Sequence, residues 1–256
     1  VTDVVWTDRG EVYLAGALWG VMNRRVQAVP FLAKVDDRGE TDWSQLLAPE
    51  IPHLTSRDTA VFQVAVTERV VLLAGSTRAG LDESNQGETD IVIAAYSHTG
   101  DLAWGKQFGS AEADDLVRVY GDVDGFTLMG VTEGDFADSC VGSSDGFILH
   151  CDSAGDWDWG VQSGGVLSDA YRGLLFDDAG TTAMNGVDGT FTLTQYDDQG
   201  EVTWSKSLSF DGLFVPTRMA KRADGSLLGR GRFFKSAGDG EYEPDITVIF
   251  CLEPAW

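Results

Sequence analysis

Apolar and polar residues alternate in four similar segments of the chain. Each segment has an alternating apolar strand, a turn that contains glycine, and a tryptophan four residues after that glycine. Alternation with a period of two residues indicates β-strands, and a polar turn with glycine tolerates the positive φ of a tight hairpin. Each segment is therefore predicted to be a β-hairpin. The segments are FLAKVDDRGETDW, IVIAAYSHTGDLAW, FILHCDSAGDWDW and TLTQYDDQGEVTW, and their tryptophans are Trp43, Trp104, Trp159 and Trp204.

A second predicted hairpin precedes each of these, and a fifth one follows the last. Chained together, the hairpins give strands a, b, c and d that repeat every ~45 to 60 residues, which is the pattern of propeller blades. Helical periodicity is absent. The sequence predicts an all-β protein, a β-propeller of about five four-stranded antiparallel blades. The second hairpins are VVWTDRGEVYLAG, VAVTERVVLLAG, VYGDVDGFTLMG, LLFDDAGTTAMNG and MAKRADGSLLGRG.

The blades are predicted to form one domain over residues 1–256, with the last blade incomplete. That blade has strands a and b and the strand DITVIFCLEP, but no convincing strand d. Either it has three strands, or the chain is cut from a larger ring. The sequence has no initiating Met and no basic-then-apolar leader, so we expect a processed protein or an excised piece. The approximate blade boundaries are 1–50, 58–110, 111–165, 166–210 and 212–256.

The hairpin of strands c and d resembles the bacterial SBBP-type β-propeller repeat. In that family a strand such as FVAKLD is followed by an Asp-x-x-Gly turn and a Trp in the next strand, and the match here is best at residues 31–43 and 90–109. The repeat is also distantly similar to the quinoprotein propeller repeat, although its Thr-Gly pair occurs only at Thr99 and Gly100. The resemblance implies an extracellular, periplasmic or cell-surface setting and no shared catalytic residues. No cofactor is predicted.

The composition narrows the class of partner. Acidic residues number 41 against 18 basic ones, which gives a formal net charge of -23. Such a field repels phosphate backbones and anionic membrane surfaces, so we expect no nucleic-acid partner. No apolar run reaches the ~18 residues of a membrane helix, so we expect no membrane insertion. Cations, sugars and basic protein surfaces remain possible ligands.

Cysteine and histidine spacing gives no metal site. Cys140, Cys151 and Cys251 form no CxxC pair, and one disulfide or three thiols both remain possible. Cys151 and Cys251 are predicted at matching positions on c strands two blades apart, too far for a bridge. His150 alternates with apolar neighbours and is interpreted as a structural histidine.

Loop lengths separate the two faces of the predicted propeller. The a–b and c–d turns are short, whereas the b–c and d–a connections are long and variable. Long loops on a rigid scaffold usually carry function, so we predict that the long-loop face is the contact surface for a protein or carbohydrate ligand. The long connections are roughly 19–27, 48–57, 78–88, 133–144 and 234–243.

Some charged and aromatic residues are candidates for that surface. Arginines early in strand a could bind an anionic or sugar ligand, or could pair with the aspartates and fill the channel. When positions are counted from the a–b turn instead of from the aspartate, Arg172 is displaced by one residue, which would turn it to the other face of the sheet. Two tryptophans outside the repeat position could stack on sugars. The candidates are Asp58, Asp115 and Asp169, at the start of strand a, then Arg118, Arg172 and Arg218, and then Trp19 and Trp157.

Three functional hypotheses remain. The leading one is a non-catalytic exported binding or scaffold module. The second is a glycosidase-like enzyme with Asp58, Asp115 and Asp169 at the channel mouth, which would require carboxyl groups ~5 to 9.5 Å apart. The third is a structural fragment of a longer repeat protein. Fold alone does not choose among them.

Overall fold

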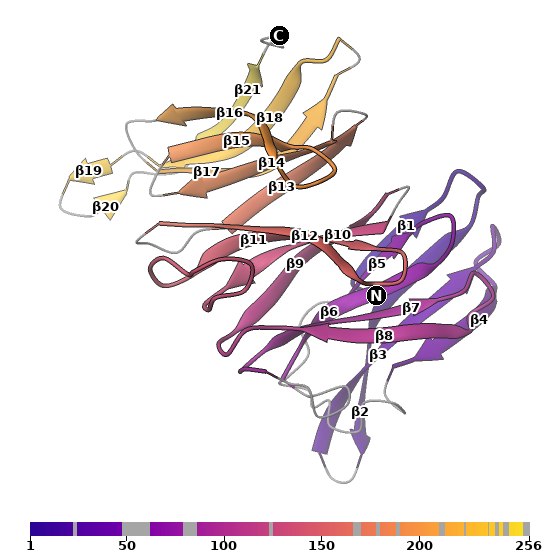
Figure 1. Cartoon of the computed structure of the whole chain (residues 1–256). Coiled ribbons are helices and arrows are strands. Elements are labelled where there is room, and N and C mark those ends of the chain that lie inside the picture. The colour runs from indigo at the N-terminus through magenta and orange to yellow at the C-terminus, as the bar shows by residue number, and fades with distance from the viewer. Residues whose placement is uncertain are drawn as a thin grey trace. The chain divides into compact units, whose positions relative to one another are not determined.

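A computed structural model gives the structure of the chain (Figure 1). The described part consists of strands and turns and contains no helix. Within it, there is no helix that could cross a membrane. The described residues are 1–22, 25–47, 62–78, 86–122, 125–165, 170–177, 180–187, 190–209, 213–222, 224–234, 236–238, 241–242 and 246–252.

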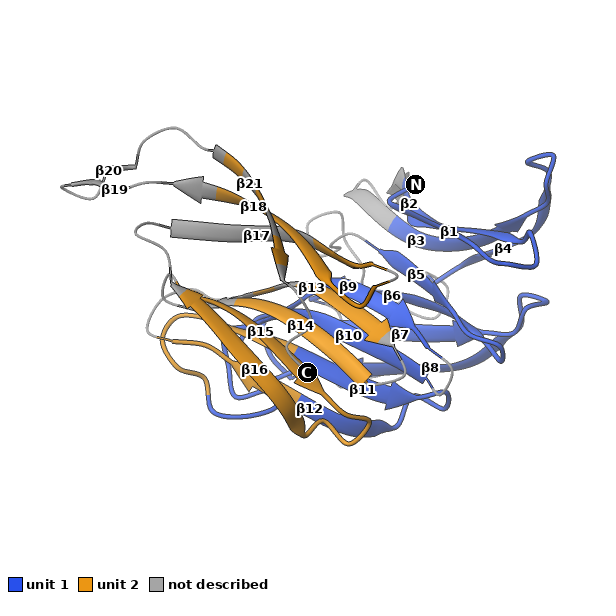
Figure 2. Ribbon diagram, turned by 90° about the horizontal axis from the view of Figure 1, so that it is seen from above, with its two compact units in different colours: residues 1–139, 148–160 blue, residues 140–147, 161–256 orange. Residues whose placement is uncertain are grey.

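The chain forms two compact units (Figure 2). One unit comprises residues 1–139 and 148–160, and the other comprises residues 140–147 and 161–256. The sheets are antiparallel and most have four strands in sequence order, which confirms the predicted blade pattern.

The first three sheets each contain four strands. Their strands are β1 (Asp3–Trp6), β2 (Val12–Met22), β3 (Arg25–Val35) and β4 (Thr41–Leu46); β5 (Gln63–Val66), β6 (Val71–Thr77), β7 (Asp90–Tyr96) and β8 (Leu102–Phe108); and β9 (Asp114–Gly121), β10 (Gly125–Thr132), β11 (Asp145–Asp152) and β12 (Trp157–Ser163).

The fourth sheet also has four strands, whereas the last main sheet has three, in the order β17-β18-β21. The described residues thus confirm an incomplete last blade. A separate pair of short strands lies within its b–c connection. The strands are β13 (Ala170–Asp177), β14 (Gly180–Val187), β15 (Thr190–Tyr196) and β16 (Val202–Ser209); β17 (Leu213–Lys221), β18 (Leu227–Phe234) and β21 (Ile246–Leu252); and β19 (Ser236–Gly238) with β20 (Glu241–Tyr242).

The c–d turns share one hydrogen-bond pattern. In the first sheet, Asp36 Oδ1 accepts hydrogen bonds from the N–H groups of Arg38 and Glu40 at 2.9 and 2.8 Å, and Gly39 has a φ of 80°. Positive φ costs glycine little, which explains the glycine of the repeat. Asp152 and Asp197 bond their turns in the same way, and Gly100, Gly155 and Gly200 also have positive φ.

The repeat tryptophans join one sheet to the next. Trp43 Nε1 donates to His98 O at 3.0 Å, and its ring lies against Gly100, where a Cβ would come within 2.8 Å. Trp104 repeats this arrangement: its Nε1 donates to Ser153 O at 3.2 Å and its ring lies against Gly155. The conserved spacing of Trp and Gly within the repeat therefore serves contact between blades.

One apolar cluster of the first unit lies between its first two sheets. Every residue of β6 and β7 is buried, and apolar side chains from both sheets form one cluster that includes Tyr13, Leu32 and Phe62. These two sheets therefore bury one another's faces, as stacked repeat units do.

Candidate functional site

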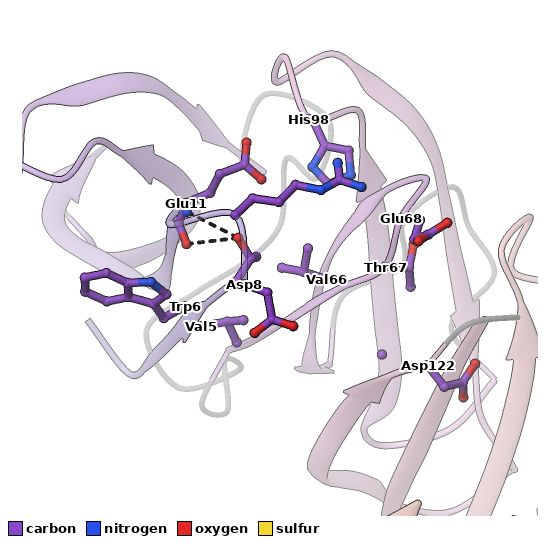
Figure 3. A pocket seen from close by; sticks show the side chains of 12 residues that line it. Val5, Trp6, Asp8, Glu11, Val66, Thr67, Glu68, His98 and Asp122 are labelled. Carbon is purple, nitrogen blue, oxygen red and sulfur yellow. Dashed lines mark hydrogen bonds between the residues drawn. The ribbon is translucent and has the colours of Figure 1, made fainter. Parts of the chain in front are cut away.

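A pocket of about 470 Å³ opens among the turns of the first three sheets (Figure 3). The first strands of these sheets are neighbours, since β5 contacts both β1 and β9. Asp3 Oδ2 accepts the N–H of Val64 at 3.1 Å, and Gln63 Oε1 accepts the N–H of Val119 at 3.2 Å. The pocket is lined by Val5, Trp6, Thr7, Asp8, Arg9, Glu11, Val66, Thr67, Glu68, His98, Gly121 and Asp122.

Local hydrogen bonds shape the turns that bear these residues. Thr7 Oγ1 accepts the N–H of Glu11 at 3.2 Å, and Thr67 Oγ1 accepts the N–H of Arg69 at the same distance. A Cβ at Gly121 would lie 2.6 Å from Val66 O, so glycine lets the third turn approach the second. Three separate turns are thus held around one opening.

Most of the charged side chains in the pocket wall are acidic. Asp8, Glu68 and Asp122 come from three different a–b turns (Figure 3), and Asp8 and Glu68 are exposed. Within the described ranges, neither Asp8 nor Glu68 forms an ion pair. A fourth carboxylate comes from Glu11. The lining also contains one cationic side chain, Arg9, and one ionisable ring, His98.

Glu11 is held at the edge of the pocket. Its Oε1 lies 2.6 Å from Lys34 Nζ, and His98 Nδ1 lies 2.9 Å from the hydroxyl of Tyr13. The hydrogen bond from Lys34 outweighs burial and lowers the pKa of Glu11. This carboxylate therefore stays charged at neutral pH.

An aromatic ring belongs to the same pocket lining. Trp6 lines the pocket and is 70% exposed, although tryptophan usually buries most of its ring. An exposed indole next to carboxylates offers a face for a cation and a flat apolar surface.

Asp122 links the pocket to a partly buried histidine. His150, on β11, lies with Nε2 3.3 Å from Asp122 Oδ2 and Nδ1 3.2 Å from Asp158 Oδ2. Its ring stacks on Trp159 at a centroid distance of 5.7 Å. Burial opposes a charge on the imidazole, but the two carboxylates outweigh it and raise the pKa of His150.

Of the predicted aspartates, Asp58 and Asp169 lie outside the described residues. Asp115 is exposed on β9. Its neighbour Asp114 is buried instead, accepting hydrogen bonds from Ser110, and burial raises the pKa of Asp114. Sequence reasoning chose the exposed member of the pair because alternation alone does not give the register of a strand start.

A shared β-bulge explains the arginines. In β9, β13 and β17 one residue is left without a cross-strand partner, between Leu116 and Arg118, between Tyr171 and Gly173, and between Pro216 and Arg218. Arg118 and Arg218 thus hold equivalent positions, whereas Arg172 is itself the bulged residue. The register therefore sets Arg172 one residue apart from the other two arginines. As ligand-binding residues, the three arginines stay a prediction. Arg118 is exposed.

The two candidate tryptophans differ. Trp19 was expected in a b–c loop but lies in strand β2 opposite Ala28. The apolar residues Val21, Val26 and Val29 continue the ladder, so β propensity extended the hairpin past the predicted strand end. Trp157 is 42% exposed and packs on Phe108 and Phe136 at ring-centroid distances of 6.4 and 5.5 Å.

The described pocket lies among a–b turns, which sequence reasoning treated only as hairpin closures. A signal was present, because each of the first three a–b turns carries an acidic residue and the first also carries Trp6. Much of the long loops at 48–57 and 78–88 lies outside the described residues, so the long-loop face stays a prediction. Across the part of the chain described here, no three His, Cys, Asp or Glu residues gather as metal ligands.

Comparisons with known proteins identify the fold. The Dos1 propeller is similar, with a TM-score of 0.54 and 7% identity over 91% of this chain and 67% of that chain. A protein of unknown function from Bacteroides caccae has a TM-score of 0.45 and 11% identity over 91% and 72% of the two chains. A subtype N10 neuraminidase-like protein of the strain A/little yellow-shouldered bat/Guatemala/060/2010 has a TM-score of 0.43 and 12% identity over 94% and 76% of the two chains.

The sheets and the likeness to Dos1 define this chain as a β-propeller. No family model and no curated protein sequence matches it. The SBBP-type repeat therefore stays a resemblance.

Proposed function

We propose that the chain is a non-catalytic binding module whose pocket on the first three blades takes up a basic segment of a partner protein. The observation that carries this proposal is that four carboxylates from three a–b turns line one pocket together with the exposed Trp6. An exported or cell-surface setting, which the SBBP-type resemblance implies, is part of the same proposal.

A lysine or arginine side chain fits this chemistry. Its charged end meets Asp8 and Glu68, and its aliphatic stem or guanidinium plane lies on the Trp6 ring, where cation–π attraction adds ~0.5–1 kcal/mol at an exposed site. The net charge of -23 attracts cationic partners from a distance and repels anionic ones.

The state of Glu11 favours binding over acid catalysis. A general acid needs a carboxyl group whose pKa is raised toward neutrality. The pKa of Glu11 is lowered instead, by the hydrogen bond from Lys34. Carboxylates that stay charged suit electrostatic recognition.

The long-loop face is proposed as a second contact surface, for a protein or carbohydrate ligand. Of its candidate residues, Trp157 is the best described, since it is 42% exposed beside Phe136. An exposed indole of this kind can stack on a sugar ring.

The pocket is tested with a labelled peptide of alternating glycine and arginine. Fluorescence anisotropy measures its affinity for the wild type and for the double variant Asp8→Asn, Glu68→Gln. We expect the double variant to bind about tenfold more weakly, because it removes two carboxylates that face the ligand. Trp6→Ala should also weaken binding, by about threefold.

A matched variant separates the pocket from the general charge of the protein. Asp37→Asn combined with Glu201→Gln removes the same charge from two exposed c–d turns outside the pocket. It should bind like the wild type. Equal weakening in both double variants, or no binding to the wild type, would contradict the proposal.

A further inference from the structure

Asp122 is both a lining residue of the pocket and an ion-pair partner of a histidine. It lines the pocket, and its Oδ2 lies 3.3 Å from His150 Nε2. His150 itself does not line the pocket, and its side chain is only 14% exposed. The imidazole can therefore change the charge at the pocket wall without touching the ligand.

The surroundings of His150 favour a controlled protonation. Among the described residues, the charged groups that meet the ring are Asp122, from the turn after β9, and Asp158, from β12. From β10, the uncharged Thr127 donates a 3.5 Å hydrogen bond to Asp122 Oδ2. Trp159 covers one face of the ring. With an aspartate at each nitrogen, both nitrogens donate when the ring is protonated.

We propose that His150 is a pH-sensitive regulator of the pocket: the protonated ring compensates the charge of Asp122 and weakens the hold on a basic ligand. Loss of that proton restores the full negative charge of the wall. This inference rests on the proposed function, because it concerns the same pocket and ligand.

The direction of the effect follows from the pKa of His150, which the two aspartates raise above 6.5. Below ~6.5 the ring is charged and both ion pairs are complete, so their contribution to stability is present and the pocket is less acidic. As the pH rises through the folded-state pKa, that stability is lost and the pocket gains negative charge. Binding should tighten over the same interval.

Another histidine must be separated from this effect. His98 also lines the pocket, and a proton there would act in the same direction. The chain has only three histidines, and the third, His53, lies outside the described residues. Three resonances therefore account for all imidazole titration.

The test follows the affinity of the glycine–arginine peptide between about pH 5.5 and 8.5, together with the histidine ring signals in NMR spectra. For the wild type we expect the affinity to rise about threefold as the His150 signal titrates. This is the effect expected when one nearby charge is lost in an environment of high effective dielectric constant. His150→Gln should bind tightly, and Asp122→Asn weakly, both without this pH dependence. His98→Gln should keep it.

The outcomes separate the two proposals. If His150→Gln binds tightly but still shows the pH dependence of the wild type, the role of His150 is overturned and the proposed function is not. The same holds if His98→Gln abolishes the dependence, or if the His150 signal titrates apart from the affinity. Absence of peptide binding at every pH would overturn the proposed function and this inference together. Should His150→Gln fail to fold, Asp122→Asn carries the test, and persistence of the pH dependence in it would contradict the inference.

Discussion

In two of the sheets, a buried aspartate on strand c explains the glycine that follows strand d. Asp90 Oδ2 accepts hydrogen bonds from the N–H of Gln86 and from Gln107 Nε2, at 2.8 and 2.9 Å. The other oxygen, Oδ1, lies against Gly109, where a Cβ would collide with it. Asp145 and Gly164 repeat the arrangement in the third sheet. The glycine at the end of strand d is therefore required by a carboxylate on strand c.

Gly109→Ala is expected to destabilise the protein by about 1–3 kcal/mol, because the new methyl group must displace the buried carboxylate. Urea unfolding measures the change in the free energy of unfolding. Gly105→Ala, on the strand that Gly109 follows, is the matched control, since its Cβ would meet only Ile93 O at 3.7 Å. Similar losses in both variants would refute this explanation of Gly109.

Cysteine reactivity provides a second prediction at the residue scale. Cys151 is buried and burial raises the pKa of its thiol to about 12, whereas Cys251 is exposed. The thiolate is the reactive form, so iodoacetamide at neutral pH should label Cys251 and leave Cys151 unmodified until the protein unfolds. Peptide mass mapping checks the sites. Early labelling of Cys151 would contradict its burial.

At the scale of elements, hairpins repeat faithfully in register. Trp43, Trp104 and Trp204 lie opposite Lys34, Ala95 and Gln195 respectively, and each pairing is followed by the same irregularity in the ladder. The predicted equivalence of these tryptophans is thus confirmed. Trp159 is buried and the other three are partly buried.

Trp43→Ala should cost about 3–5 kcal/mol, because it removes the ring that packs on the next sheet and the hydrogen bond to His98 O. Trp6→Ala is the control for loss of an indole, since Trp6 is 70% exposed and should cost little stability. Chemical denaturation compares the two. A stability loss no larger for Trp43→Ala than for Trp6→Ala would refute the contact between blades as a source of stability.

At the scale of the whole molecule, excess negative charge opposes compaction. With 41 acidic and 18 basic residues, mutual repulsion is relieved on unfolding. Raising NaCl from about 0.05 to 0.5 M shortens the Debye length from more than ~10 Å to less than ~5 Å.

The midpoint of urea unfolding should therefore rise with salt. KCl at equal ionic strength should have the same effect, because screening does not depend on the identity of the monovalent cation. A midpoint that is constant or falls with salt would show that repulsion between carboxylates does not limit stability.

The sequence by itself determined the class of fold and the repeat. Alternation with a period of two, turn glycines and the spacing of glycine to tryptophan are local patterns, and they predicted four-stranded blades with an incomplete last one. The sequence located the a–b turns but did not show that they line a pocket. The acidic residues of separate turns come to line one pocket only after three sheets have packed.

Only the tertiary structure decided which residues form the site. A one-residue bulge separated Arg172 from Arg118 and Arg218, and a one-residue register difference buried Asp114 in place of Asp115. Asp122 and His150 are 28 positions apart in sequence, yet an ion-pair distance of 3.3 Å joins them. Periodicity records which residues alternate, whereas register and the packing of successive sheets decide which side chains meet.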